Sequence, residues 1–315
     1  MNSSKTPLLG SKGRIWLLVS VLVVLSLLVA ITSIVWLHTY EQRTNATTQA
    51  NTGPQSFTVG PNALLSIKEQ GGDISVFPSN TNTITVIPRN HGTTLAPDPQ
   101  HVHLIYNQTL NAQGNNQISV TTDPWFSNTD FLVEIPNSTA VQIALSSGSI
   151  DVHAGNGLNA TTSSGSIYLE NIQGATSAHT DSGDVTASNI TGPLTISSSS
   201  GSLRMQQIKG QVNAKTWSGD VIANSTALSG NSLLQTQNGS VRFDGSIASN
   251  GAYTMDTTSG DVDLTLPDNV AFALEASTAS GTVQNAFGNT IVGAMPRAQL
   301  SLHTQNGSIA IVKAS

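Results

Sequence analysis

The sequence predicts an all-β protein, a parallel β-solenoid of about nine rungs that follows an irregular β lead-in and one N-terminal transmembrane helix. Three observations support this prediction. Nine segments repeat one glycine-centred pattern, and the aliphatic residues around each glycine alternate with a period of 2. In addition, one apolar stretch near the N-terminus is long enough to cross a bilayer.

Composition favours thin β layers over a large globular core. Charged residues fill 10% of the 315 positions, against about 25% in ordinary soluble domains, and aromatic residues fill 5%. The twelve Lys and Arg are outnumbered by eighteen Asp and Glu, and an acidic chain without a basic run is unsuited to binding nucleic acid. The chain has no Cys, which excludes disulfides, thiolate metal sites and a cysteine nucleophile.

The first expected element is a membrane anchor. Ile15–Leu37 is uncharged, and at 1.5 Å per residue it spans a hydrocarbon core of about 30 Å. Trp16 and Trp36 lie near its ends, at the headgroup level that indole rings prefer. The basic residues that precede it are Lys5, Lys12 and Arg14. This asymmetry predicts a cytoplasmic tail over residues 1–14 and places residues 38–315 on the outer side of the cell membrane.

A cleaved signal peptide is the competing interpretation of this stretch. The apolar region of a signal peptide usually runs over about 7–15 residues, which is shorter, so we favour a retained anchor. Residues 38–56 are polar and rich in Asn, Thr and Gln, and we expect them to form a flexible linker.

Residues 57–136 are predicted to be an irregular β lead-in. Short runs of alternating apolar residues occur there without a fixed spacing, and prolines such as Pro88 and Pro136 close them. Gly72–Val76 already has the pattern of the later repeats. The region is therefore either an irregular first rung or a β-sandwich-like entry to the solenoid.

Residues 137–315 carry the repeat. Each unit has a small polar residue, a glycine, a second small polar residue and then an aliphatic residue, and successive glycines are 17 to 26 residues apart. The glycines are Gly148, Gly165, Gly183, Gly201, Gly219, Gly239, Gly260, Gly281 and Gly307. Glycine suits a tight turn between two strands because it reaches positive φ without steric cost.

Alignment on these glycines produces columns of similar residues. The second position after the glycine is aliphatic in all nine units, from Ile150 to Ile309, and the third position before it is Thr or Ser in eight of them. One unit buries too few side chains to fold alone, so the units must stack, about 4.8 Å apart, into a rod roughly 40 Å long. The Thr column is then expected to become a ladder of stacked hydroxyls.

The longest interval lies near the C-terminus. Asp268–Pro296 is expected to contain a loop, followed by a final rung over Ala298–Val312.

On these features the chain resembles the bacterial putative-adhesin β-solenoid domain family. The shared features are the successive Ser-Gly-Ser or Ser-Gly-Asp units, the strand Phe131–Pro136 ahead of them and the ending Leu302–Ile309. The resemblance covers roughly residues 60–315. It implies a β-solenoid with a binding role at the cell surface, and the family has no established catalytic residues to carry over.

Two groups of residues raise the question of a metal site. His101 and His103 would share one strand face, but a third ligand is missing nearby, so exposed strand histidines are the favoured interpretation. Asp184, Asp220 and Asp261 follow their glycines as in calcium-binding β-roll repeats, which however need a nine-residue period and an Asp in every turn. We interpret these Asp residues as turn formers and assign no metal or cofactor site.

A polysaccharide hydrolase is the remaining chemical alternative. Asp181 with Asp184, or Asp261 with Asp263, could imitate the paired carboxylates of such enzymes. The many Gly-Ser pairs are turns, and no Gly-x-Ser-x-Gly elbow with His and Asp partners occurs. No catalytic residue is therefore assigned, and the chain is predicted not to be an enzyme.

Two functions fit these expectations. The first is a membrane-anchored extracytoplasmic module that binds an unknown surface glycan or protein, as an adhesin does. The second is a structural or regulatory protein of the cell envelope that acts through partner membrane proteins. Flat, weakly charged faces of Ser, Thr and Asn suit the first function, because they can contact a partner through many weak hydrogen bonds.

Overall fold

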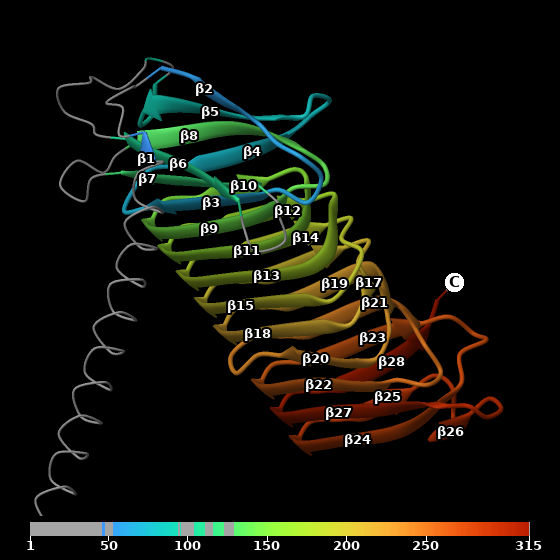
Figure 1. Ribbon diagram of the computed structural model, residues 1–315. Helices are drawn as coiled ribbons and strands as arrows, with labels where there is room; N and C mark the ends of the chain where they lie inside the picture. Colours follow the sequence, from blue (N-terminus) through green and yellow to red (C-terminus); the bar gives the residue numbers. More distant parts are fainter. Residues whose placement is uncertain are drawn as a thin grey trace, which may run out of the picture. The chain divides into compact units, whose positions relative to one another are not determined.

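The computed structural model describes residues 46–47, 53–93, 95, 104–110, 116–122 and 129–314 (Figure 1). The chain divides into two compact units, Met1–Thr47 and Thr48–Ser315, and in the first unit only strand β1 (Ala46–Thr47) is described. The predicted tail, the predicted transmembrane helix and most of the predicted linker lie outside the described residues. Among the residues that are described, no helix has the length and hydropathy needed to cross a membrane.

The described part of the second unit is built from two sheets and contains no helix. In hydrogen-bonding order, the first sheet contains β6 (Leu104–Leu110), β7 (Asn116–Thr122), β3 (Leu64–Glu69), β9 (Ala140–Ser147), β11 (Gly155–Ser164), β13 (Ile172–Ser182), β15 (Leu194–Ser200), β18 (Val212–Ser218), β20 (Asn231–Gln235), β22 (Ala252–Ser259), β27 (Ala298–Asn306), β24 (Phe272–Ser280) and β26 (Ile291–Val292).

The second sheet contains, in the same sense, β2 (Gln55–Thr58), β5 (Thr83–Asn90), β8 (Thr129–Pro136), β4 (Ile74–Ser79), β10 (Ile150–Val152), β12 (Ile167–Glu170), β14 (Val185–Ser188), β16 (Leu203–Gln206), β19 (Val221–Leu228), β21 (Val241–Ile247), β23 (Val262–Leu266), β28 (Ile309–Lys313) and β25 (Val283–Asn285). The short strand β17 (Lys209–Gly210) pairs with β19.

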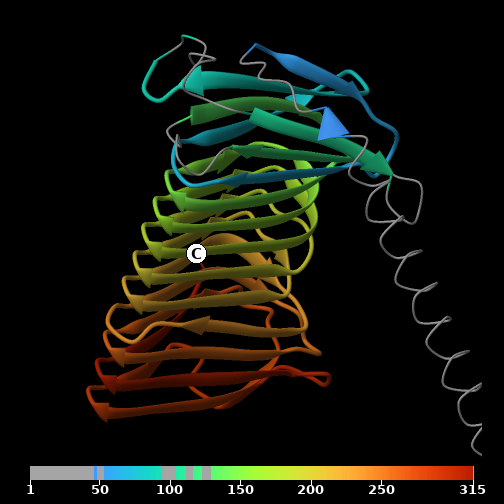
Figure 2. The same ribbon diagram turned by 60° about the vertical axis from the view of Figure 1, so that its left-hand side comes forward.

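Each rung takes one strand from each sheet, and in the repeat units a glycine turn joins the two strands. Neighbouring rungs run parallel, so that Ile150 pairs with Ile167 and Ile167 with Val185 (Figure 2). These three side chains are at most 1% exposed, because the core lies between the two sheets. The prediction of an all-β chain with stacked parallel strands is confirmed.

The glycines form a column in which successive backbones touch. A Cβ added to Gly183 would lie 2.3 Å from the carbonyl oxygen of Gly165, and the φ of Gly183 is +146°. A side chain at this position would therefore meet the backbone of the next rung as well as an unfavourable backbone conformation.

The Thr column lies inside the stack, but it is not the predicted ladder of hydroxyls. Each hydroxyl donates to the carbonyl oxygen of a glycine in the adjacent rung; Thr180 Oγ1, for example, lies 2.9 Å from Gly165 O. The same bond, at 2.8 to 3.1 Å, is made by Thr162, Ser198, Thr216, Thr236, Thr257, Thr278 and Thr304. The turn conformation leaves the glycine carbonyl without a ladder partner, and the Thr hydroxyl satisfies it.

The N-terminal end of the stack contains one rung at Gly72 and additional strands on its outer side. Strands β3 and β4, joined through Gly72, form a rung that pairs in parallel with β9 and β10. Strands β7 and β8 pair with the other side of that rung, also in parallel. The antiparallel strands β2, β5 and β6 then flank β8 and β7. Thus the earliest rung in the sequence lies between two later ones.

The C-terminal end shows the same reversal of order. Strands β27 and β28 pair with β22 and β23 on one side and with β24 and β25 on the other (Figure 1). The predicted final rung over Ala298–Val312 exists, but the expectation that it ends the stack is wrong. Asp268–Pro296, which is expected to contain a loop, also holds the repeat unit centred on Gly281, and its strands β24 and β25 form the outer rung.

Candidate functional site

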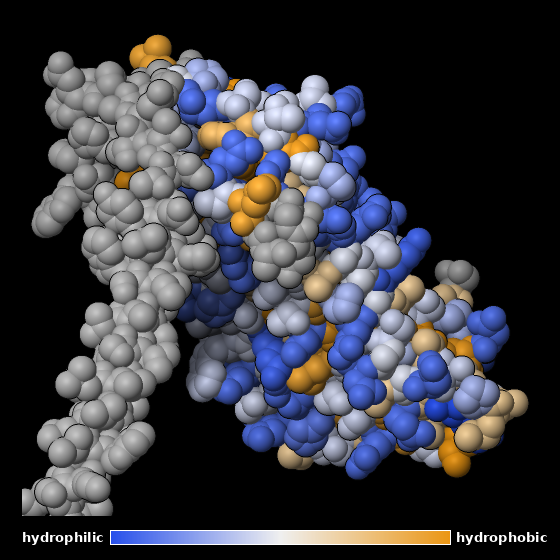
Figure 3. Space-filling view, viewed as in Figure 1, coloured by the Kyte–Doolittle hydropathy of each residue, from blue (hydrophilic) through white to orange (hydrophobic). Residues whose placement is uncertain are grey.

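The outer face of the first sheet is flat and polar. One outward column of side chains runs in register through Thr161, His179, Ser197, Lys215, Gln235, Asp256 and His303. Neighbours in the column interact: His179 Nδ1 lies 2.8 Å from Ser197 Oγ, and Gln235 Nε2 donates to Asp256 Oδ2 at 2.9 Å. Figure 3 shows hydrophilic residues spread over the stack and hydrophobic ones in small groups.

Trp217 interrupts this polar face. The residue lies near the end of β18 and is 58% exposed, although indole rings are usually buried. Its backbone is fixed, because the carbonyl oxygen of Trp217 accepts the Asn238 N–H at 2.9 Å. Lys215 precedes it by two residues and points to the same side of the strand. A rigid sheet therefore presents one large aromatic ring to solvent.

A second group of side chains surrounds His153, just after β10. Its Nδ1 lies 2.9 Å from Glu170 Oε2, and its Nε2 lies 2.9 Å from Asp151 Oδ1. The ring stacks on Phe77 with centroids 4.9 Å apart and contacts Tyr168 at 5.5 Å. Partial burial lowers the pKa of His153, but the hydrogen bond to Glu170 and the nearby Asp151 carboxylate outweigh this effect, so that the pKa is raised overall.

Next to His153 the surface is hollowed into a recess of about 550 Å³. Its lining consists of His153, Pro78, Gly155 and Ser138 together with the amide side chains of Asn137, Asn156, Asn171 and Gln173. Asn137 and Asn171 follow β8 and β12, while Asn156 and Gln173 lie at the starts of β11 and β13, so several rungs contribute to one cavity. We call this cavity the amide recess.

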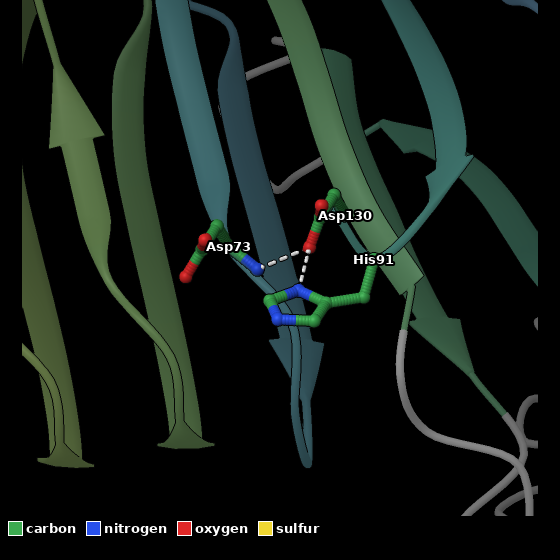
Figure 4. A group of neighbouring side chains, drawn as sticks. All are labelled: Asp73, His91 and Asp130. Atoms are coloured by element: carbon green, nitrogen blue, oxygen red, sulfur yellow. Dashed lines mark hydrogen bonds and ion pairs between the residues drawn. The ribbon is translucent and has the colours of Figure 1, made fainter. Parts of the chain in front are cut away.

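A third group joins Asp73, His91 and Asp130, whose ligand-type atoms lie within 4.8 Å of one another. Figure 4 shows Asp130 Oδ1 accepting the Asp73 N–H and facing His91 Nδ1, both at 2.7 Å, while the Asp73 carboxylate turns away. Asp130 Oδ2 accepts the Gly92 N–H at 3.1 Å. A metal ion would have to displace these bonds. We therefore interpret the cluster as a set of hydrogen bonds that holds the ends of β4, β5 and β8 together. The hydrogen bond to Asp130 raises the pKa of His91.

The three Asp residues of the calcium alternative each bond to the turn of the adjacent rung. Asp184 Oδ1 accepts the Ser202 N–H at 2.8 Å, and Asp220 and Asp261 accept the N–H groups of Ser240 and Ser308 at the same distance. A serine occupies the intervening rung each time, so the carboxylates are two rungs, or roughly 9–10 Å, apart. The structure does not bring them together around one ion.

The carboxylates considered for a hydrolase each interact with a different neighbouring group. Asp181 lies 3.2 Å from His179 Nε2, Asp184 pairs with Arg204 at 2.7 Å, and Asp263 pairs with Arg242 at 3.2 Å. The backbone N–H of Ser202, followed by Arg204, lowers the pKa of Asp184. A carboxyl held ionised in this way is unsuited to donate a proton to a leaving group.

Glu69 is the one acidic residue of the described part that is buried. It is 4% exposed at the end of β3, where it borders a cavity of about 460 Å³ with Thr121, Leu145 and other residues. The Thr122 hydroxyl donates to Glu69 Oε2, and Oε1 has no hydrogen-bond partner among the described residues. Burial raises the pKa of Glu69 to about 7, against the smaller lowering effect of the Thr122 hydroxyl.

Sequence reasoning did not find the His153 group or Glu69, although the alignment contained a signal for both. The fifth position after the glycines Gly72, Gly148 and Gly165 holds Phe77, His153 and Glu170, which therefore stack in one column. Glu69 takes the Thr position of the Gly72 unit. His101 and His103 lie outside the described residues.

Comparison with known proteins gives one family match and two similar solved structures. The profile of the Toastrack DUF4097 family matches residues 62–248. Among solved structures, the chain is similar to a putative cell adhesion protein from Clostridium sporogenes, with 10% identity, coverage of 83% of this chain and 99% of that chain, and a TM-score of 0.23. A putative adhesin from Bacteroides fragilis has 12% identity, coverage of 83% and 96%, and a TM-score of 0.38.

A search of curated proteins gives no significant match. The family match covers more than half of the chain and includes most of the glycine-centred units on which the predicted resemblance depends. The chain therefore belongs to the Toastrack DUF4097 family.

Proposed function

We propose that this chain is a non-catalytic surface-binding module, an adhesin, that residues 15–37 hold at the cell membrane with residues 38–315 on the outer side. The observation that carries the proposal is Trp217, an indole ring 58% exposed on the flat polar face of the first sheet. Large aromatic residues on rigid surfaces are the commonest anchors of binding interfaces, because they bury much area at little entropic cost.

The surroundings of Trp217 suit a macromolecular partner. The polar column through Ser197, Lys215 and Gln235 runs beside it and offers hydroxyl, ammonium and amide groups. Because the strands are already ordered by the stack, binding requires little further ordering of the protein. An unknown glycan or protein surface can thus contact one aromatic centre with a polar rim, as in typical interfaces.

Several carboxylates form ion pairs or hydrogen bonds within the protein, which supports a binding role rather than catalysis. Asp184 and Asp263 are paired with arginines, and the Asp130 carboxylate accepts two backbone N–H groups. These groups hold turns and neighbouring strands together.

The test is binding of the full chain to glycan arrays and to whole cells, with Trp217→Ala as the variant and Gln206→Ala as the control. Gln206 is exposed on the opposite sheet, so its removal is expected to leave binding unchanged. Loss of Trp217 is expected to weaken binding at least tenfold. Equal binding by both variants contradicts the proposed face.

A companion experiment separates adhesion from a regulatory role in the envelope. Residues 48–315 form a compact unit, so this fragment and the full chain can be compared in pull-downs. Binding by the fragment supports adhesion. Recovery of a membrane protein by the full chain alone supports the regulatory alternative.

A further inference from the structure

We propose that the amide recess beside His153 binds an uncharged saccharide. This inference rests on the proposed binding function and assigns it a second contact site, independent of Trp217, beside the ends of β8 and β12 in the second sheet and the starts of β11 and β13 in the first. The recess has a volume of about 550 Å³, within the roughly 300–1,000 Å³ of typical small-molecule sites.

The lining of the recess matches hydroxyl groups. Asn137, Asn156 and Gln173 form no side-chain hydrogen bond with any described residue, while Asn171 Oδ1 accepts from Asn189 Nδ2 at 2.6 Å. Each free amide offers donors and an acceptor side by side, which is the arrangement that two neighbouring hydroxyls of a sugar ring require. Gly155 leaves the recess open, because it projects no side chain into it.

The His153 group gives the recess a fixed wall. Phe77 covers one face of the imidazole, and the two ring nitrogens contact Glu170 and Asp151. Because both nitrogens are engaged and lie on opposite sides of the ring, His153 and its two carboxylates do not converge on one metal ion. Tyr168, 36% exposed, contacts the same ring and helps to hold it in place.

The charge of this wall selects against anions. When His153 is protonated, one positive and two negative charges leave a surplus negative charge at the edge of the recess. A phosphate, sulfate or carboxylate ligand would be repelled. Anionic sugars are therefore disfavoured, and the free amides beside this wall suit the hydroxyls of an uncharged sugar.

The experiment is calorimetric titration of the full chain with three neutral disaccharides, lactose, mannobiose and chitobiose, and with sialyllactose as the anionic counterpart. We expect at least one neutral probe to bind and sialyllactose to bind at least tenfold more weakly than lactose. Asn156→Ala combined with Gln173→Ala is expected to weaken the bound probe at least tenfold. The matched control is Asn250→Ala, an exposed amide in a distant turn, which is expected to change nothing.

The outcomes separate this inference from the proposed function. If no neutral probe binds, or if the double variant binds as the unmodified chain does, the inference is wrong; cell binding that still depends on Trp217 then leaves the proposed function standing. If the double variant loses the sugar while Trp217→Ala retains it, the recess is an independent site. Circular dichroism of each variant checks that the strands are intact.

Discussion

Glu69 shows how one side chain can give this fold a pH dependence. It occupies the position that Thr or Ser takes in most later rungs, and its Oε1 has no partner among the described residues. The pKa is 4.5 for an ordinary glutamate and about 7 for this one. Between these values the folded state holds a proton that the unfolded state releases, so stability falls as pH rises from about 4.5 to 7 and stays low above it.

Replacement of Glu69 by Gln is expected to remove this dependence. At pH 8 the variant should be more stable than the unmodified chain by roughly 3 kcal/mol, at about 1.4 kcal/mol per unit of pKa shift, and near pH 4.5 the two should agree. Urea unfolding at a series of pH values measures the difference. Parallel pH profiles for the two proteins would show that Glu69 does not titrate in this range.

Gly183 shows a steric requirement that no other residue can meet. A Cβ there would lie 2.3 Å from the Gly165 carbonyl oxygen, at a φ of +146°. Gly183→Ala is expected to lower the free energy of unfolding by more than about 3 kcal/mol, because it adds backbone strain to a collision between rungs.

The matched control for Gly183 is Gly60→Ala. An added Cβ at Gly60 has no atom within 4 Å, so thermal unfolding should hardly change. Equal effects at the two positions would mean that the rungs can shift to accept a methyl group.

At the scale of the strand, the Thr column joins each rung to the next. Thr180 is fully buried, and its hydroxyl is 2.9 Å from Gly165 O. Thr180→Val keeps the shape but leaves that carbonyl without its partner, and we expect a loss of about 1–3 kcal/mol.

Thr186→Val is the control for this substitution. Thr186 lies on the outer side of β14, where Val suits a strand equally well, so its replacement should cost less than about 0.5 kcal/mol in chemical denaturation. Similar losses for Thr180 and Thr186 would contradict the role given to the buried hydroxyl.

The strands were predictable because each follows from a local rule. The aliphatic columns, the glycine turns and the buried Thr positions all repeat at fixed offsets, and they agree with the registers around Ile150, Ile167 and Val185. The direction of the Thr hydroxyl was not predictable, since it depends on where a neighbouring rung turns its carbonyl. The His153 group was missed because Phe77, His153 and Glu170 form one column only when the units of Gly72, Gly148 and Gly165 are aligned together.

The order of the rungs could not be read from the sequence for a related reason. The units share most of their apolar pattern, so the pattern alone does not decide whether β24 or β27 lies on β22. Packing at the ends decides between them. Asn285 stands where other units have an aliphatic residue, and its amide bonds to Phe287 N and Asn289 O, which turns the chain back over the outer rung. Phe287 packs edge-on against Phe272 at 5.2 Å.

At the scale of the whole molecule, a residue at the same position of the repeat is buried to a different extent, and so stabilises the fold differently, in the middle and at the end of the stack. Val262 and Val283 both follow their glycines by two residues, but Val262 is fully buried and Val283 is 43% exposed, because no described rung covers β25. Exposed Ile291 and Met295 lie in the segment after β25, where Figure 3 shows hydrophobic residues near the C-terminal end of the stack.

We therefore expect Val262→Ala to cost about 2 kcal/mol and Val283→Ala less than about 1 kcal/mol. Thermal unfolding of the two variants measures the contrast, and hydrogen exchange should show faster exchange in β25 than in β23. Equal costs would indicate that another surface covers the outer rung in solution.

The reversed order at the C-terminal end has a consequence for synthesis. A ribosome completes β24 and β25 before β27 and β28, yet β27 and β28 must reach the stack first. Rungs therefore cannot all be added in the order of synthesis. Either β24 and β25 stay unpaired until β27 and β28 are in place, or they first pair with β22 and β23 and are then displaced by β27 and β28. In a nascent chain that stalls before residue 298, β24 and β25 would lack the strands β27 and β28 on which they pack. Chaperones and proteases would be expected to recognise such an incomplete stack.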